Sequence, residues 1–96
     1  MKKAFNEAEI EKALKTLPKW KLEDGKLVRG WTFKDFVQAM KFVNQVAVMA
    51  EAAGHHPDID VRYNRVDLGL VSHDAGGITE RDVAMACQIE KDLSKE

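Results

Sequence analysis

The pattern of apolar and polar positions divides the chain into seven segments of helix and strand. Apolar side chains recur at helical spacing over residues 6–17, which end at Pro18, over residues 32–53, and again after Thr79. Strict alternation marks four shorter segments, namely residues 20–23, 26–31, 59–63 and 66–70. The order α-β-β-α-β-β-α predicts an α+β domain, in which three helices pack on one face of a four-stranded antiparallel sheet.

Three pairs of residues have the spacing of a capping box, which marks the start of a helix. They are Asn6 with Glu9, Thr32 with Asp35, and Thr79 with Asp82. In each pair the first side chain can accept a backbone N–H, and the acidic residue three positions on can return the contact. At the other end of the long helix, Gly54 is typical of a residue that ends a helix in left-handed conformation.

The strands form two predicted hairpins. Asp24-Gly25 is a strong signal for a two-residue turn, and Asn64-Arg65 can turn the second pair of strands. The first turn predicts two cross-strand pairs on one face of the sheet, which are Leu22 with Leu27 and Trp20 with Arg29.

The long helix carries two apolar stripes on nearly opposite sides. One consists of Phe36, Met40, Val43, Ala47 and Ala50, and the other of Phe42, Val46, Met49 and Ala53. Only one stripe can face the sheet of its own chain, although the first and last helices can cover part of the other. We therefore expect a homodimer or homotetramer, with Phe42, Val46 and Met49 near a helical interface.

Composition indicates one ordinary globular domain over residues 1–96. Apolar residues make up 45%, charged residues 32%, and the net charge is -1. A dedicated nucleic-acid binder needs a basic face to displace phosphate counterions, and this mixed-sign charge offers none. The longest apolar run is far shorter than the roughly 20 residues of a membrane span. Neither nucleic acid nor membrane is therefore expected as a partner.

Cys87 is the single cysteine, so no intrachain disulfide and no cysteine-based zinc site can form. Its neighbours Val83, Ala86 and Ile89 favour a small buried thiol. Behind the lysines of the first six residues there is no long apolar stretch of the kind that a signal peptide needs. Together these features predict a cytoplasmic protein.

The three histidines, His55, His56 and His73, lie within nineteen residues and at the ends of predicted elements. An imidazole can transfer protons near neutral pH, and functional side chains gather on loops held by rigid elements. Pro57 favours extended backbone at His56, so the side chains of the adjacent pair should point apart.

Two carboxylates can serve these histidines. Glu51 lies one helical turn before His55, and Asp82, in the first turn of the last helix, could fix the tautomer of a histidine. Two other interpretations stay open on the residues alone. The histidines could have only structural roles, or they could bind zinc with water as the fourth ligand, although diverging neighbours meet one ion poorly.

Seven residues at fixed spacing resemble the signature of the pterin-4a-carbinolamine dehydratases. They are Glu51, His55, His56, Pro57, Tyr63, His73 and Asp82. The segment Tyr63-Asn64-Arg65-Val66 and the earlier stretch from Trp20 through Gly25 to Trp31 and Phe36 are similar to the family as well.

The resemblance implies a cofactor-free hydro-lyase that converts 4a-hydroxytetrahydropterin, such as 4a-hydroxytetrahydrobiopterin, into quinonoid dihydropterin and water during pterin recycling. By analogy with the family, His55 and His73 form the acid/base pair and His56 binds and orients the pterin. Glu51, Asp82 and Ser72 would support them, no metal would be bound, and Tyr63 would pack in the core.

Two positions depart from the family pattern, and one competing function remains. Many members carry an aromatic residue where this chain has Ile59, and Asp where it has Gly54. Without the aromatic residue, pterin binding is expected to be looser or the preferred pterin to differ, and without the Asp a polar contact beside the histidines is expected to be missing. Some animal relatives act as dimerisation cofactors for a transcription factor, so the alternative is a non-catalytic binding protein.

Overall fold

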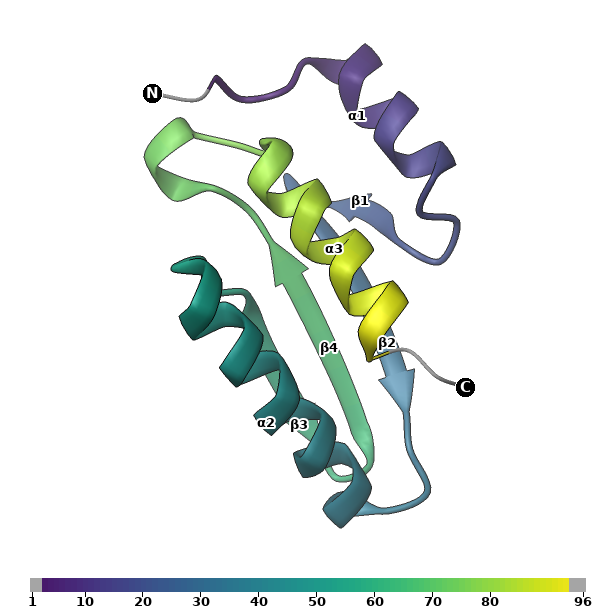
Figure 1. Cartoon of the computed structure of the whole chain (residues 1–96). Coiled ribbons are helices and arrows are strands. Elements are labelled where there is room, and N and C mark those ends of the chain that lie inside the picture. The colour runs from purple at the N-terminus through teal and green to yellow at the C-terminus, as the bar shows by residue number, and fades with distance from the viewer. Residues whose placement is uncertain (1–2, 94–96) are drawn as a thin grey trace.

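The computed structural model describes residues 3–93, so the first two residues of the lysine-bearing start lie outside it. The elements are α1 (Glu7–Lys15), β1 (Lys21–Glu23), β2 (Lys26–Thr32), α2 (Phe36–Ala53), β3 (Asp58–Arg62), β4 (Arg65–Leu70), a short 3-10 turn η1 (His73–Ala75) and α3 (Glu80–Asp92) (Figure 1). The predicted order of helices and strands is confirmed, and η1 is an addition between β4 and α3. No helix in residues 3–93 is long and apolar enough to cross a membrane.

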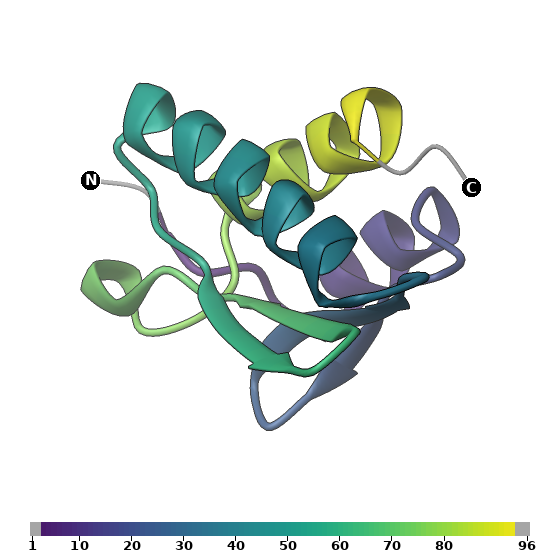
Figure 2. The same cartoon turned by 90° about the horizontal axis from the view of Figure 1, so that it is seen from below.

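The four strands form one antiparallel sheet in the order β1-β2-β4-β3. All three helices lie on one side of this sheet, and no helix of residues 3–93 covers its other face (Figure 2). The predicted α+β class is therefore confirmed. Because β2 and β4 are the two central strands, their inward side chains supply much of the core, including Leu27, Val66, Leu68 and Leu70.

The first hairpin turns as predicted. Asp24 and Gly25 both have positive φ, 51° and 76°, and Leu22 pairs with Leu27. Trp20 precedes β1 rather than lying in it, yet its side chain is buried. Leu22 is 45% exposed, because β1 is a three-residue strand at the edge of the sheet.

The second hairpin turns one residue earlier than predicted. Arg62 pairs with Arg65, so the two turn residues are Tyr63 and Asn64. Tyr63 adopts a positive φ of 53° and is 68% exposed. The expectation that Tyr63 packs in the core is therefore wrong, because the shift of the turn takes Tyr63 out of the strand.

Two of the three capping boxes are present as predicted, those of Asn6 with Glu9 and of Thr79 with Asp82. The third is wrong. Thr32 ends β2, and Asp35 is itself the N-cap of α2, where its side chain accepts from the backbone N–H of Gln38 at 2.8 Å. At the other end of α2, Gly54 has the predicted left-handed conformation, with φ of 63°.

Helix α2 buries Phe42 and Val46 of the stripe that was expected to meet another subunit, whereas Met49 of that stripe is only partly buried. The buried residues of the helix are Ala39, Phe42, Val46 and Ala50. Phe42 lies against Trp31, with the ring centroids 4.7 Å apart, so the assignment of Phe42 and Val46 to a subunit interface is wrong. The helical spacing shows two stripes but does not show which one faces the sheet. The large apolar side chains of α2 that remain exposed are Phe36, Val37 and Val48.

Cys87 is exposed, which contradicts the expected buried thiol. Helix α3 turns Met85, Ala86 and Ile89 into the core. Because successive residues of an α-helix are about 100° apart, Cys87 falls beside this buried stripe rather than within it.

A partly buried cluster of polar and charged side chains joins the first hairpin to α3. The indole N–H of Trp20 donates to Glu90 Oε1 at 2.7 Å, and the Arg29 guanidinium forms an ion pair with the same oxygen. The guanidinium carbon of Arg29 also lies 4.4 Å from the centre of the Trp31 ring, which favours a cation–π contact. Glu90 thus ties the end of α3 to β2 beneath it.

We predict that Glu90→Ala lowers the free energy of unfolding by about 2–3 kcal/mol, because a guanidinium and an indole N–H in a buried setting lose their shared acceptor. The matched control is Glu11→Ala on the exposed side of α1, which should change the stability by no more than about 0.5 kcal/mol. Urea denaturation of both variants checks this. Equal stability of the two variants would contradict the structural role of Glu90.

Candidate active site

The end of α2 meets two later segments of the chain at one end of the molecule. The C-terminal end of α2, the η1 turn that follows β4, and the N-terminal end of α3 all lie at this end (Figure 1). The arrangement follows from the topology, because α2 and β4 run toward this end and α3 begins there and runs back. It brings together the loops that carry the predicted histidines and their carboxylates.

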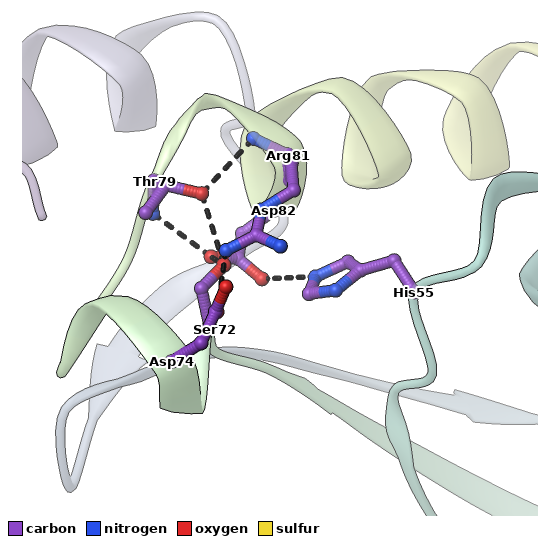
Figure 3. Close-up of polar contacts among 6 residues, drawn as sticks. All are labelled: His55, Ser72, Asp74, Thr79, Arg81 and Asp82. Carbon is purple, nitrogen blue, oxygen red and sulfur yellow. Dashed lines mark hydrogen bonds and ion pairs between the residues drawn. The ribbon is translucent and has the colours of Figure 1, made fainter. Parts of the chain in front are cut away.

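Asp82 lies at the centre of this end and has no exposed surface. One carboxylate oxygen, Oδ1, lies 2.6 Å from His55 Nε2. The other, Oδ2, accepts from the Ser72 hydroxyl at 2.8 Å and from the backbone N–H of Thr79 at 2.9 Å (Figure 3). A single buried carboxylate therefore connects the segment after α2, the end of β4 and the start of α3.

The hydroxyl of Thr79 extends this network. It lies 2.9 Å from Ser72 Oγ and accepts from the backbone N–H of Arg81 at 3.2 Å. A serine hydroxyl has one proton, and that of Ser72 goes to Asp82, so the Thr79 hydroxyl donates to Ser72. The family resemblance had indicated Ser72 and Asp82 as supporting residues. It had not indicated that the Thr79 hydroxyl joins their hydrogen-bond network. The capping box of Thr79 with Asp82 was the only signal of this role.

The contact with Asp82 determines which nitrogen of His55 can accept a proton. An ionised carboxylate only accepts hydrogen bonds, so His55 Nε2 carries the proton of this contact. In the neutral imidazole Nδ1 then has the free lone pair. The His55 side chain is only 11% exposed, and it lines a cavity of ≈ 180 Å³ between the ends of α2 and α3.

His56 has a different partner from its neighbour. Its Nε2 contacts the Glu51 carboxylate, and both side chains are largely exposed. The extended backbone before Pro57 had predicted side chains that point apart, and the two rings do have separate carboxylates. The expected contact of Glu51 with His55 is not formed, because α2 ends at Ala53 and the left-handed Gly54 redirects the chain.

His73 is the first residue of η1 and is exposed. Within residues 3–93 its side chain makes no hydrogen bond or ion pair. The next residue, Asp74, accepts a hydrogen bond from Arg81 Nη2 at 2.5 Å, and this contact lowers the pKa of the Asp74 carboxyl. His73 therefore lies free on a turn whose neighbouring residue is held by α3.

The arrangement does not resemble a metal centre. In the part of the chain that the structure describes, no group of three His, Cys, Asp or Glu side chains is placed to hold an ion. His55 and His56 each face their own carboxylate instead of converging. The two departures from the family pattern are also outside the Asp82 network: Gly54 supplies the left-handed helix end, and Ile59 is 38% exposed on β3.

Comparison with known proteins finds one family that matches over nearly the whole chain. The sequence model of the family described as pterin 4 alpha carbinolamine dehydratase matches residues 3–91. A protein of Acidobacterium capsulatum, provisionally named pterin-4-alpha-carbinolamine dehydratase, is 62% identical over 84% of this chain and 88% of its own length. A relative with the same provisional name from Chloroflexus aurantiacus is 54% identical over 91% of this chain and 94% of its own length.

Solved structures show the same architecture. A crystal structure described as a transcriptional coactivator/pterin dehydratase from Brucella melitensis superposes with a TM-score of 0.86, at 39% identity over 92% of this chain and 96% of that one. A pterin dehydratase-like protein, described as a RuBisCO assembly factor in the alpha-carboxysome, has a TM-score of 0.63 at 20% identity over 80% of this chain and 89% of its own. The second likeness shows the fold alone.

The fold and site define an α+β protein in which a buried carboxylate holds one histidine, at the end of the molecule that also carries the other two. With the match over residues 3–91 and relatives above 50% identity, the chain belongs to the pterin 4 alpha carbinolamine dehydratase family.

We predict that Asp82→Ala lowers the free energy of unfolding by about 3 kcal/mol or more, because a buried N-cap partner and two buried side-chain contacts are lost together. Asp35→Ala is the matched control, since Asp35 caps α2 without joining a buried network. It should cost only about 1 kcal/mol. Thermal or urea denaturation gives both values, and equal losses would show that the inner contacts of Asp82 add nothing to stability.

Proposed function

We propose that this protein is a 4a-hydroxytetrahydropterin dehydratase, a lyase that forms quinonoid dihydropterin and water by histidine acid/base catalysis. The observation that carries the proposal is the contact of His55 with the buried Asp82, at the same end of the molecule as His56 and His73. Membership of the family supports the pterin substrate. The proposal includes 4a-hydroxytetrahydrobiopterin as substrate, pterin recycling as its role, and a single dehydratase domain over residues 1–96.

The reaction needs one base and one acid. The proton leaves N5, the C4a–O bond breaks as the hydroxyl receives a proton and departs as water, and a double bond forms between C4a and N5. General acid–base groups with a pKa near the working pH suit both transfers. We assign the base to His55, because Asp82 holds the proton on Nε2 and leaves Nδ1 to accept. We assign the acid to His73, whose exposed ring has no carboxylate partner within residues 3–93.

The other residues have supporting roles in this proposal. His56, held by Glu51, would bind and orient the pterin ring at the rim of the site. Ser72 and Asp82 fix the inner geometry rather than contact the reacting atoms, since both are buried. No step requires a metal or an organic cofactor, because proton transfers between imidazole and substrate complete the reaction.

A second candidate function is a non-catalytic binding role. The relative from Brucella melitensis is described as a transcriptional coactivator as well as a pterin dehydratase, and it is 39% identical to this chain. Such a role would use an outer surface rather than the histidines. Replacing a histidine would then leave partner binding unchanged, whereas it would abolish a dehydratase.

We predict that His73→Ala lowers the turnover number by roughly 100-fold or more, the usual scale of general acid–base catalysis. The denaturation midpoint should not change, because the ring is exposed and makes no side-chain hydrogen bond in the described chain. Asn44→Ala, an exposed substitution on α2, is the control and should retain wild-type turnover. Wild-type turnover in a folded His73→Ala variant would remove His73 from the mechanism.

A homodimer or homotetramer in the cytoplasm also remains our proposal. The interface would use the outer side of α2, where Phe36, Val37 and Val48 are 49%, 65% and 72% exposed, instead of Phe42 and Val46. Large apolar side chains exposed on one helix favour such contacts.

We predict that light scattering at micromolar concentration gives two or four times the 10.8 kDa of one chain. Val48→Glu should shift the protein toward monomers, because it places a charge in the apolar interface. Lys12→Glu, at an exposed position on α1, should not. A monomer in the unaltered protein would contradict the proposed assembly.

A further inference from the structure

The turn that carries His73 is attached to the rest of the protein at two places. At its base, the backbone of Ser72 pairs with that of Gly77, and the Ser72 hydroxyl donates to Asp82. At its tip, Asp74 accepts from Arg81 at 2.5 Å (Figure 3). The base attachment is buried and the tip attachment is not, so the Arg81 contact is the one that can set the position of the tip.

Arg81 is placed to connect the two proposed catalytic histidines. It lies in the first turn of α3 beside Asp82, which binds His55. Its side chain lines the same cavity as His55, and its guanidinium reaches the residue next to His73. Two consecutive residues of one helix therefore act on the two histidines. Asp82 binds His55 directly, and Arg81 holds the turn that carries His73.

Stability alone does not account for this placement of Arg81. Its Nε is buried without a hydrogen-bond partner among the residues described, and leaving such a donor unpaired costs stability. The contact with Asp74 is largely exposed on the Asp74 side, and exposed ion pairs contribute little to global stability. This placement of Arg81 therefore contributes little to the stability of the folded state.

We propose that Arg81 is a positioning residue for the dehydratase reaction. Through Asp74 it holds the η1 turn so that His73 stays at a fixed place relative to His55. The inference rests on the proposed function, because it concerns the spacing of that acid/base pair. A small misplacement of a catalytic group lowers the rate steeply, even when the substrate still binds.

The kinetic test compares Arg81→Gln with Arg62→Gln. Arg62 forms an exposed ion pair with Asp60 on β3, so its loss is a matched removal of one surface guanidinium. Arg81→Gln should lower kcat roughly tenfold or more with KM changed by less than about threefold, because orientation is lost and binding is kept. Arg62→Gln should retain wild-type kcat and KM. Both variants should keep the wild-type denaturation midpoint.

Two further variants separate positioning from simple loss of charge. Asp74→Asn should lower kcat as Arg81→Gln does, and the double variant should be no slower than either single one, since both remove one interaction. Arg81→Lys, which keeps the positive charge, should recover part of the lost kcat. Additive losses in the double variant would overturn the proposal.

Hydrogen exchange tests the positioning without reference to activity. The amides of Ala75 and Gly76 donate within the turn, to Ser72 and His73. They should exchange faster in Arg81→Gln than in Arg62→Gln or the unaltered protein. Unchanged exchange overturns the inference whatever the kinetics. The unaltered protein could also show no dehydratase activity while these amides still exchange faster in Arg81→Gln. That result would refute the proposed function but uphold the role of Arg81 in holding the turn.

Discussion

Asp82 has no exposed surface, and both of its carboxylate oxygens are occupied, Oδ1 by His55 and Oδ2 by Ser72 and Thr79. A buried carboxylate is costly unless it is fully hydrogen-bonded, so these three contacts depend on one another. They come from the segment after α2, the end of β4 and the start of α3. The same interaction that begins the last helix therefore also closes one end of the domain and orients a histidine.

The sheet and helices supply the rigid frame that this carboxylate requires. The Arg29, Trp20 and Glu90 cluster fixes the far part of α3 to the first hairpin, and Phe42 and Val46 fix α2 over the central strands. With both helices anchored, their ends cannot drift apart, and the loops between them remain free to carry exposed side chains. His56 and His73 lie on such loops, which is where functional side chains commonly gather.

Much of this was predictable from the sequence, because local patterns carry it. Alternation and helical spacing gave the element order, and the pairs Asn6 with Glu9 and Thr79 with Asp82 gave two helix starts.

The errors arose where contacts between distant parts of the chain decide the structure. A helical wheel does not say which stripe of α2 faces the sheet, nor that Cys87 lies beside the buried stripe of α3. One residue of shift at the second turn moved Tyr63 from the core to the surface. Likewise, the bond of Glu51 to His56 depends on the turn of the chain at Gly54, which spacing alone does not reveal.

The central claim is that these histidines catalyse the dehydration of a hydroxylated tetrahydropterin, and the most direct measurement is the assay of the purified protein. The 4a-hydroxytetrahydropterin is generated in situ and its decay is followed spectroscopically with and without the protein, alongside His55→Ala. We predict that the protein accelerates decay to the quinonoid dihydropterin in proportion to its concentration, and that His55→Ala removes most of this acceleration. Decay at the uncatalysed rate in the presence of folded protein would contradict the account.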